Sequence, residues 1–378
     1  MNNITLDMLE AILEEGVEQG ASDIILKHQS LPLMRLNGEW HPYNADDAAA
    51  PTIQDLKDLA ASLLNDRYEE FLERREADLQ LSTDHHRFRV NIAFQRSGPF
   101  MTFRPIAPQP PELEDLNLLD ALTVIPFLKA LVEQPRGLVL VTGPTGSGKS
   151  TTLAALINHI NKRYRKHIIT IEDPLEFLHT DQKSTIEQRE IGNDTQSFAN
   201  ALRSVLRQAP DIILVGEMRD PETIAAAMTA AETGHLVIST VHTNNAPKSI
   251  NRIIDAMPSD QANQIRTQLA ASLVGVVTQQ LVPRKDKGRQ VALEIMTVTD
   301  TIRGHIRNPA ATENNYYDFM TSNRETGQIL MDQQLALGVR ENLITDETAR
   351  AKSMALDRLQ SALRSTPGTA SPFRFAKQ

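Results

Sequence analysis

The chain has 378 residues, 40% of them hydrophobic and 23% charged, and this length and composition predict two or three globular domains. Its formal net charge of -9 disfavours a surface built mainly to bind nucleic-acid backbones, although a local basic channel is compatible with an acidic total. The absence of cysteine excludes disulfides, cysteine-ligated zinc and thiol nucleophiles.

The N-terminal region lacks the features of a secretory signal. Residues 1–18 carry acidic side chains where a signal peptide would carry positive charge. No uninterrupted apolar run approaches the roughly 18 residues that a membrane-spanning helix needs. We therefore expect a cytoplasmic protein without a transmembrane segment, which is compatible with docking on a membrane complex.

Residues 1–106 carry the patterns of a compact α+β domain. An opening helix is expected because four apolar residues fall on one face, namely Leu9, Ile12, Leu13 and Val17. Residues 53–71 predict a second helix. Short apolar or alternating runs between turn residues predict strands over residues 23–27, 33–36, 39–43, 87–94 and 100–103.

Proline crowding predicts an interdomain linker over residues 107–118, because this stretch holds neither helix nor central strand. Residues 119–364 then alternate helical patterns with brief apolar runs, which predicts an α/β domain with a parallel sheet and C-terminal helices. The runs are residues 138–141, 167–171, 212–215 and 236–239. Beyond residue 246 the pattern is mostly helical, broken only at 282–284 and 291–295. Residues 365–378 predict a disordered tail.

A complete phosphate-loop motif, G-x-x-x-x-G-K-S, lies between the first apolar run and a helical pattern. Its glycines allow backbone N–H groups to close around phosphates, Lys149 reaches the β and γ phosphates, and Ser150 offers a hydroxyl to Mg²⁺. The motif predicts binding of ATP with magnesium. The expected nucleotide-binding residues are Gly143, Pro144, Thr145, Gly146, Ser147, Gly148, Lys149, Ser150 and Thr151.

Polar side chains follow the other apolar runs, where ligands of open parallel sheets bind. These are Glu172, Glu217 and His242, and carboxylates are suited to hold the metal's water shell and to orient an attacking water. Glu217 is therefore expected beside Ser150 at the metal. Asp211 begins the run that Glu217 follows, about 20 Å away at strand spacing, and is assigned to structure.

Three ordered segments resemble the Asp box, Walker B and His box of the type II/IV secretion ATPase superfamily. They are Ile169-Thr-Ile-Glu-Asp-Pro-Leu-Glu-Phe177, Arg207-Gln-Ala-Pro-Asp-Ile-Ile-Leu-Val-Gly-Glu-Met-Arg-Asp220 and Ala230-Ala-Glu-Thr-Gly-His-Leu-Val-Ile-Ser-Thr-Val-His-Thr243. Within that superfamily the chain is similar to the pilus retraction ATPases of the PilT and PilU type. The resemblance implies a PAS-like N-terminal domain, a RecA-like ATPase domain and a homo-hexameric ring.

The resemblance also implies roles for single residues. Glu172 corresponds to the base, Glu217 to the Walker B carboxylate and His242 to the contact with the γ phosphate. Arg89 and Arg104 match two N-terminal arginines that the family uses at the nucleotide, a role suited to a planar, fixed charge. A solvated arginine on a strand face remains the alternative for either position.

Two features bear on the place of the chain within the superfamily. Extension and type II secretion ATPases usually carry a four-cysteine zinc module and a longer N-terminal region, and this chain has neither, which favours retraction. Residues 301–307 resemble the retraction segment AIRNLIR but depart at its first, fourth and fifth positions. Main motor, accessory paralogue, and a superfamily member serving secretion or DNA uptake therefore all remain open.

The partners follow from the same resemblance. We expect a homo-hexamer docked peripherally at the inner-membrane pilus machine, in contact with its platform protein. A paralogous retraction ATPase is a further candidate partner, and no direct nucleic-acid contact is expected.

Overall fold

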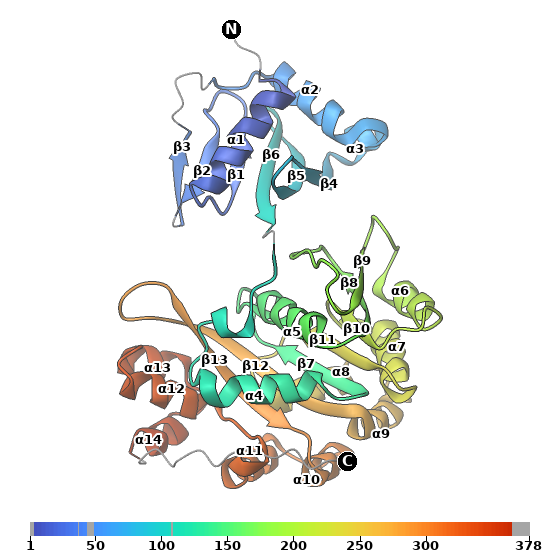
Figure 1. The fold of residues 1–378 in the computed structure, drawn as a ribbon, viewed down its shortest axis with the longest axis vertical. Coiled ribbons are helices and arrows are strands. Elements are labelled where there is room, and N and C mark those ends of the chain that lie inside the picture. The colour runs from blue at the N-terminus through green and yellow to red at the C-terminus, as the bar shows by residue number, and fades with distance from the viewer. Residues whose placement is uncertain (1–3, 37, 44–48, 107–108, 365–378) are drawn as a thin grey trace. The chain divides into compact units, whose positions relative to one another are not determined.

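The computed structural model describes residues 4–36, 38–43, 49–106 and 109–364 (Figure 1). The chain forms two compact units, Met1–Gln109 and Pro110–Gln378. Each unit has its own sheet and its own hydrophobic core. Among the described residues, no helix is long and apolar enough to cross a membrane.

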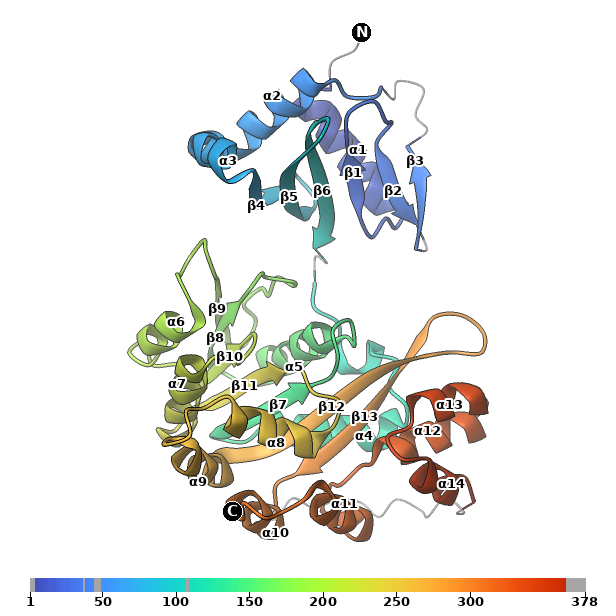
Figure 2. The ribbon, with the colours of Figure 1, turned by 180° about the vertical axis from the view of Figure 1, so that it is seen from behind.

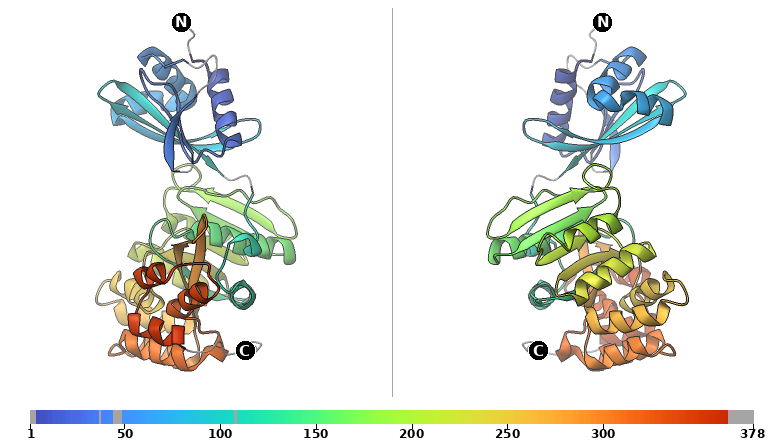
Figure 3. Two further views of the ribbon diagram at one scale, coloured as in Figure 1. Left: turned by 90° about the vertical axis from the view of Figure 1, so that its left-hand side faces the viewer. Right: turned by 90° about the vertical axis from the view of Figure 1, so that its right-hand side faces the viewer.

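The first unit is a six-stranded antiparallel sheet with strand order β3-β2-β1-β6-β5-β4. Alternate residues of its two longest strands, such as Phe88, Val90 and Phe103, point into a core shared with the helices. The helices lie together on that one side of the sheet (Figure 3). The elements are α1 Leu6–Glu18, β1 Ile24–Leu26, β2 Leu33–Leu36, β3 Glu39–Pro42, α2 Ile53–Leu64, α3 Tyr68–Arg74, β4 Glu76–Ser82, β5 Arg87–Gln95 and β6 Gly98–Ile106.

Two sequence expectations for this unit were wrong. The helix predicted over residues 53–71 is interrupted at Asn65, whose φ of 47° lies outside the helical region, and a 3-10 turn separates α2 from α3. Strand β4 was missed altogether. Its sequence, Glu-Ala-Asp-Leu-Gln-Leu-Ser, alternates polar and apolar residues as a half-buried strand does, so the signal was present and was overlooked.

The second unit contains a seven-stranded sheet with strand order β13-β12-β7-β11-β10-β8-β9. All neighbouring strands are parallel except β13, which pairs antiparallel with β12. The central strands are fully buried apolar runs, as expected for a parallel sheet covered on both faces. Their bounds are β7 Gly137–Thr142, β8 His167–Glu172, β9 Thr185–Glu190, β10 Ile212–Val215, β11 Leu236–Val241, β12 Leu273–Pro283 and β13 Arg289–Thr297.

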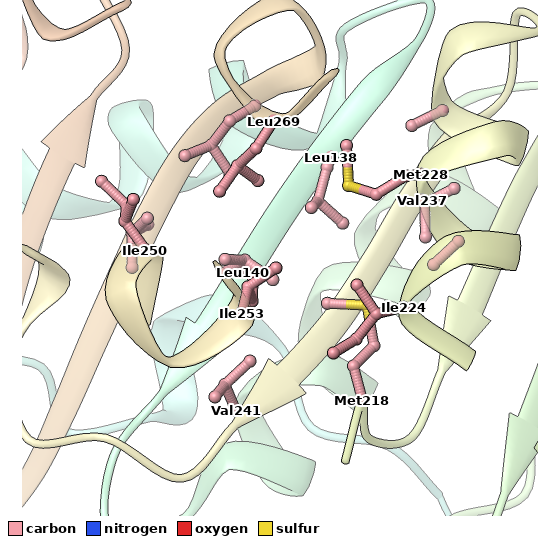
Figure 4. Packing of buried hydrophobic residues seen from close by; sticks show 14 of the residues in the cluster. Leu138, Leu140, Met218, Ile224, Met228, Val237, Val241, Ile250, Ile253 and Leu269 are labelled. Carbon is pink, nitrogen blue, oxygen red and sulfur yellow. The ribbon is translucent and has the colours of Figure 1, made fainter. Parts of the chain in front are cut away.

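Helices cover both faces of this sheet (Figures 1 and 2). Leu138 and Leu140 of β7 point to the face covered by α6 to α11, where α7, α8 and α9 supply Ile224, Ile253 and Leu269 (Figure 4). Their neighbours in β7 point to the other face, against α4 and α5. The bounds are α4 Ala121–Val132, α5 Lys149–Arg163, α6 Phe198–Val205, α7 Pro221–Glu232, α8 Ala246–Asp255, α9 Ala262–Ser272, α10 Asp300–Arg307 and α11 Glu313–Ser322.

The prediction of a mostly helical region after residue 246 was wrong for one segment. An eleven-residue strand, β12, occupies residues 273–283 and forms a hairpin with β13. Strand β12 is buried on both faces, so its sequence shows no alternation, and it follows α9 without an intervening turn residue. Periodicity alone therefore could not separate strand from helix here. Strand β9, at the edge of the sheet, was also missed, because nearly all its residues are polar and it contains no apolar run.

The predicted linker of residues 107–118 is too long. Leu113, Leu116 and Leu118 are buried in the core of the second unit, and Leu118 forms a bridge with Val291 of β13. Three C-terminal helices, α12 Met331–Arg340, α13 Asp346–Lys352 and α14 Leu356–Arg364, pack on the β12–β13 hairpin. The predicted tail, residues 365–378, lies outside the described residues.

Candidate active site

The phosphate-loop motif forms the connection between β7 and α5, at the carboxyl end of the central strand. Gly143 and Gly148 both have positive φ, at 145° and 86°, where a side chain would be strained. A Cβ at Gly143 would also lie 2.4 Å from the backbone oxygen of Gln279. The loop therefore needs glycine for its conformation and for its close approach to β12.

The middle of the loop is exposed, whereas the residues on either side of it are mostly buried. Pro144, Thr145 and Gly146 are exposed, whereas Ser147 and Lys149 are buried. The Nζ atom of Lys149 donates to the carbonyl oxygens of Gly143 and Pro144, at 3.0 and 3.1 Å. Burial lowers the pKa of Lys149, and the negative charges of Glu176 and Glu217 oppose that shift. The Lys149 side chain thus folds back onto the loop, and its charge interacts with those of Glu176 and Glu217.

The first turn of α5 continues the loop. Ser150 is half-buried directly after Lys149, and Thr151 follows it in the same turn. The N–H groups of a first helical turn have no partner within the helix, and the helix dipole places partial positive charge there. These residues therefore form the floor of an anion site.

Glu217 and His242 follow two neighbouring parallel strands, β10 and β11. His242 Nε2 lies 3.5 Å from one carboxylate oxygen of Glu217, and Arg219 Nε lies 2.7 Å from the other. Burial lowers the pKa of His242, the charge of Lys149 lowers it further, and Glu217 opposes both. The strand ends thus gather a cation, a carboxylate and an imidazole around the phosphate loop.

Glu172 ends β8, the strand on the other side of β10. The N–H of Gly216 donates to the carbonyl of Ile171 at 2.7 Å, which holds the segments carrying Glu172 and Glu217 side by side. Burial raises the pKa of Glu172 to about 7, and the charge of Glu176 adds to the increase. Gln188 donates a long hydrogen bond to the carboxylate, at 3.4 Å.

The opposite edge of the sheet, where the strands begin, holds Asp211, which was assigned to structure, and His235. Asp211 accepts hydrogen bonds from the Lys166 ammonium and the His167 N–H, both at 2.9 Å. His235 lies 3.0 Å from the carbonyl oxygen of Ala230 through its Nδ1 atom. Both residues connect chain segments at strand beginnings, and the assignment of Asp211 to structure agrees with its contacts.

Arg89 and Arg104 lie in the first unit, directly opposite each other on β5 and β6. Directly opposed residues point to the same face of a sheet, here the face away from the helices. Arg104 donates from Nε and Nη2 to one oxygen of the buried Asp23, at 2.8 and 2.7 Å. Their predicted role at the nucleotide stays a prediction, because the phosphate loop belongs to the second unit.

Sequence reasoning missed two residues of this region. Arg219 belongs to the segment that resembles Walker B but was given no role, although its contact with Glu217 is short. Gln279 touches the phosphate loop from β12, which was read as helix. A glutamine that interrupts a buried apolar strand was the available signal for the second.

The donor atoms present fit magnesium. Ser150 supplies a hydroxyl oxygen and Glu217 a carboxylate oxygen, and Mg²⁺ takes oxygen donors, keeps several waters and shares the substrate's phosphates. Neither residue is deeply buried: Ser150 is half-buried and the Glu217 side chain is 18% exposed. The arrangement suits a metal that binds together with a nucleotide.

Comparison with known proteins identifies the class. The family model described as "Type II/IV secretion system protein" matches residues 2–363. The chain belongs to this family, as the motifs predicted.

Relatives of known role refine this assignment. A twitching motility protein of Neisseria gonorrhoeae is 42% identical over 325 residues, 85% of this chain and 84% of the relative. The type IV pilus retraction ATPase PilT of Pseudomonas aeruginosa is 40% identical over 353 residues, 92% and 98% of the two chains. The type IV pilus ATPase PilU of that organism is 37% identical over 345 residues, 90% and 87%.

A solved structure agrees with the fold. The crystal structure of the pilus retraction motor PilT with bound ADP matches with a TM-score of 0.85 at 38% identity, covering 93% of this chain and 99% of that one. The predicted fold class is therefore confirmed: a RecA-like ATPase domain preceded by a smaller α+β domain and followed by C-terminal helices. The chain is of the PilT type.

Proposed function

We propose that this chain is an ATP-hydrolysing motor subunit that powers the retraction of type IV pili. Its similarity to PilT over nearly the full length of both chains supports this function. The observation that carries the chemistry is the convergence of Lys149, Glu217 and His242 at one edge of the central sheet. Phosphoryl transfer needs positioning and charge stabilisation, which these groups supply.

Each group has a distinct task in this proposal. The N–H groups of the phosphate loop and the Lys149 ammonium hold the β and γ phosphates. Ser150 and Glu217 would hold magnesium, which would neutralise phosphate charge. Glu172 accepts a proton from the attacking water, a task for which a pKa of about 7 is well matched. His242, held against Glu217, contacts the γ phosphate.

Arg89 and Arg104 complete the proposed site from an N-terminal unit. A guanidinium is charged at every physiological pH and matches the oxygens of a phosphate in geometry. Asp23 already holds the Arg104 guanidinium in place, so little conformational entropy is lost when it meets a phosphate. In a homo-hexameric ring these arginines would serve the phosphate loop of a neighbouring copy.

The location and partners follow from the task. A motor that consumes ATP and withdraws pilin subunits must work in the cytoplasm, docked at the inner-membrane base of the pilus. We propose its platform protein as the partner that receives the force, and no direct contact with nucleic acid.

The decisive first experiment removes the phosphate-binding cation. Lys149→Ala should lower ATP turnover by a factor of about 100 or more, because the phosphate charge loses its fixed partner. Deletion of the gene should leave excess pili and abolish twitching. ATP turnover like that of the unaltered protein in Lys149→Ala would refute the site, and loss of pili in the deletion strain would refute retraction.

An accessory role in the same machine is the second candidate, and a specific observation favours considering it. The segment that departs from AIRNLIR forms α10, in which Ile302 and Ile306 are buried. Of the departing positions, Thr301 and Gly304 are exposed, whereas His305 is half-buried and its ring packs edge-on against Tyr316 of α11, with ring centroids 5.4 Å apart. Two of the three changes therefore alter the surface of α10, and the third alters its contact with α11. Turnover by the isolated protein, measured beside pilus retraction, separates a motor from an accessory subunit.

A further inference from the structure

We propose that Gln279 is a positioning residue that holds the phosphate loop in the conformation that binds nucleotide. This proposal rests on the proposed function of the loop as the ATP site. Gln279 belongs to none of the sequence motifs. It lies in β12, the strand beside β7, and is 1% exposed.

The side-chain amide of Gln279 connects the loop to the helix that follows it. Its Nε2 atom donates to the carbonyl oxygen of Ser147 at 2.6 Å. Its Oε1 atom accepts from the hydroxyl of Thr152 at 2.7 Å. Thr152 is itself 1% exposed, so both hydrogen bonds are shielded from water and are costly to leave unmade.

The bond to Ser147 determines where the next N–H group points. A trans peptide is planar, with its C=O and N–H on opposite sides. Because Gln279 holds the Ser147 carbonyl towards β12, the N–H of Gly148 must point away from β12. The backbone N–H groups of such a loop are what cradles phosphate. Gln279 therefore fixes the orientation of one phosphate-binding donor.

The Thr152 hydroxyl determines which end of the Gln279 amide faces the loop. The hydroxyl donates to Oε1, so the NH₂ group must face Ser147, as its donor role requires. Thr278, the residue before Gln279 in β12, hydrogen-bonds through its hydroxyl to the hydroxyl of Thr142 at 2.8 Å, which holds β7 against β12. The loop is thus ordered before nucleotide arrives, which lowers the entropy cost of binding.

The test compares two adjacent glutamines. Gln279→Met keeps the shape of the side chain but removes both hydrogen bonds, and it should raise the Kd for MgATP and for MgADP roughly tenfold. Gln280→Met is the matched control, because Gln280 points to the other side of β12, where its amide contacts the sulfur of Met354. This control should bind both nucleotides normally.

Two further variants separate positioning from packing. Gln279→Glu, measured at a pH at which its carboxyl is ionised, can still accept from Thr152 but cannot donate to the Ser147 carbonyl, and it should weaken binding at least as much as Gln279→Met. Thr152→Val removes only the group that orients the amide and should weaken binding by a smaller factor. In steady-state assays KM should rise by a larger factor than kcat falls.

The results that overturn the proposal are specific. Unchanged nucleotide affinity in folded Gln279→Met or Gln279→Glu, as judged by thermal unfolding without ligand, would refute it. Equal effects of Gln279→Met and Gln280→Met would instead indicate general packing. Failure of the proposed function is distinguishable, because Lys149→Ala would then bind and hydrolyse ATP normally whatever the Gln279 variants do.

Discussion

In the central sheet, the edge formed by the carboxyl ends of the strands (the carboxyl edge) and the edge formed by their amino ends carry similar residue types in different surroundings. At the carboxyl edge, Glu172 and Lys149 have shifted pKa values because burial disfavours their charged forms. At the opposite edge, Asp211 is 43% exposed and its pKa is lowered by hydrogen bonds from His167 and Lys166. The comparison teaches that a carboxylate becomes reactive where its charge is poorly compensated and remains structural where partners satisfy it.

The largest expected effect separates these edges directly. Glu217→Ala and Glu172→Ala should each keep nucleotide binding but lower turnover by a factor of about 100 or more, because metal orientation and proton acceptance act mainly in the transition state. Asp211→Asn is the matched control and should show no separation of binding from turnover. The measurements are ATP affinity and steady-state hydrolysis. An Asp211→Asn phenotype equal to that of Glu217→Ala would place the site at the wrong edge.

A second test asks whether two arginines of the N-terminal unit act together with the groups at the carboxyl edge. Arg89→Ala or Arg104→Ala should bind ATP at the phosphate loop but hydrolyse it about 10 to 100 times more slowly, because charge that develops on the phosphates loses a partner. Addition of Lys149→Ala protein should restore part of the turnover. Some interfaces of a mixed ring then combine an intact loop with intact arginines.

Native mass spectrometry must verify that such rings contain both variants. If verified mixed rings recover no turnover at any mixing ratio, the arginines either act on the nucleotide of their own chain or have only a structural role. The Arg104 variant needs its own stability control, because it also removes one of the partners of the buried Asp23, which keeps Ser22 and Arg35.

The smallest effect concerns pH. Glu172 accepts a proton only when ionised, so a pKa of about 7 predicts that kcat rises with pH below 7 and levels off above about 8. Below pH 7 the fall should approach tenfold per pH unit. A flat profile between pH 6 and 8 would argue against Glu172 as the base.

Stability changes in the opposite direction with pH. The folded-state pKa of Glu172, about 7, lies above the ordinary glutamate value of 4.5, so the folded protein binds more protons between these values. The contribution of this group to stability is therefore largest below about pH 4.5 and declines as the pH rises to about 7. Loss of activity between pH 7 and 6 thus cannot be attributed to unfolding caused by this residue.

Local pattern was enough to predict the strands that carry the candidate site. The four apolar runs before the phosphate loop, Glu172, Glu217 and His242 correspond to β7, β8, β10 and β11. Parallel strands end at one edge of their sheet, so the residues after them had to lie near one another. The family and the fold class followed from the same motifs and are confirmed.

Other elements could not be read locally. Strand β12 is buried on both faces and lacks alternation, and residues 113–118 resemble a linker although their leucines complete a core. In both cases the decisive fact is what packs against the segment. A segment's own periodicity does not contain that information.

The sequence by itself determined that this protein has a phosphate loop, because the motif residues are fixed by the chemistry of phosphate, and its other motifs identified the secretion ATPase superfamily by resemblance. Only the tertiary structure decided which neighbours support them. It brought Gln279 from β12 against Ser147, 132 positions earlier in the chain, and His242 against Glu217. Such pairings depend on strand order and register, which arise from burying the whole sheet between its helices and not from any local stretch of residues.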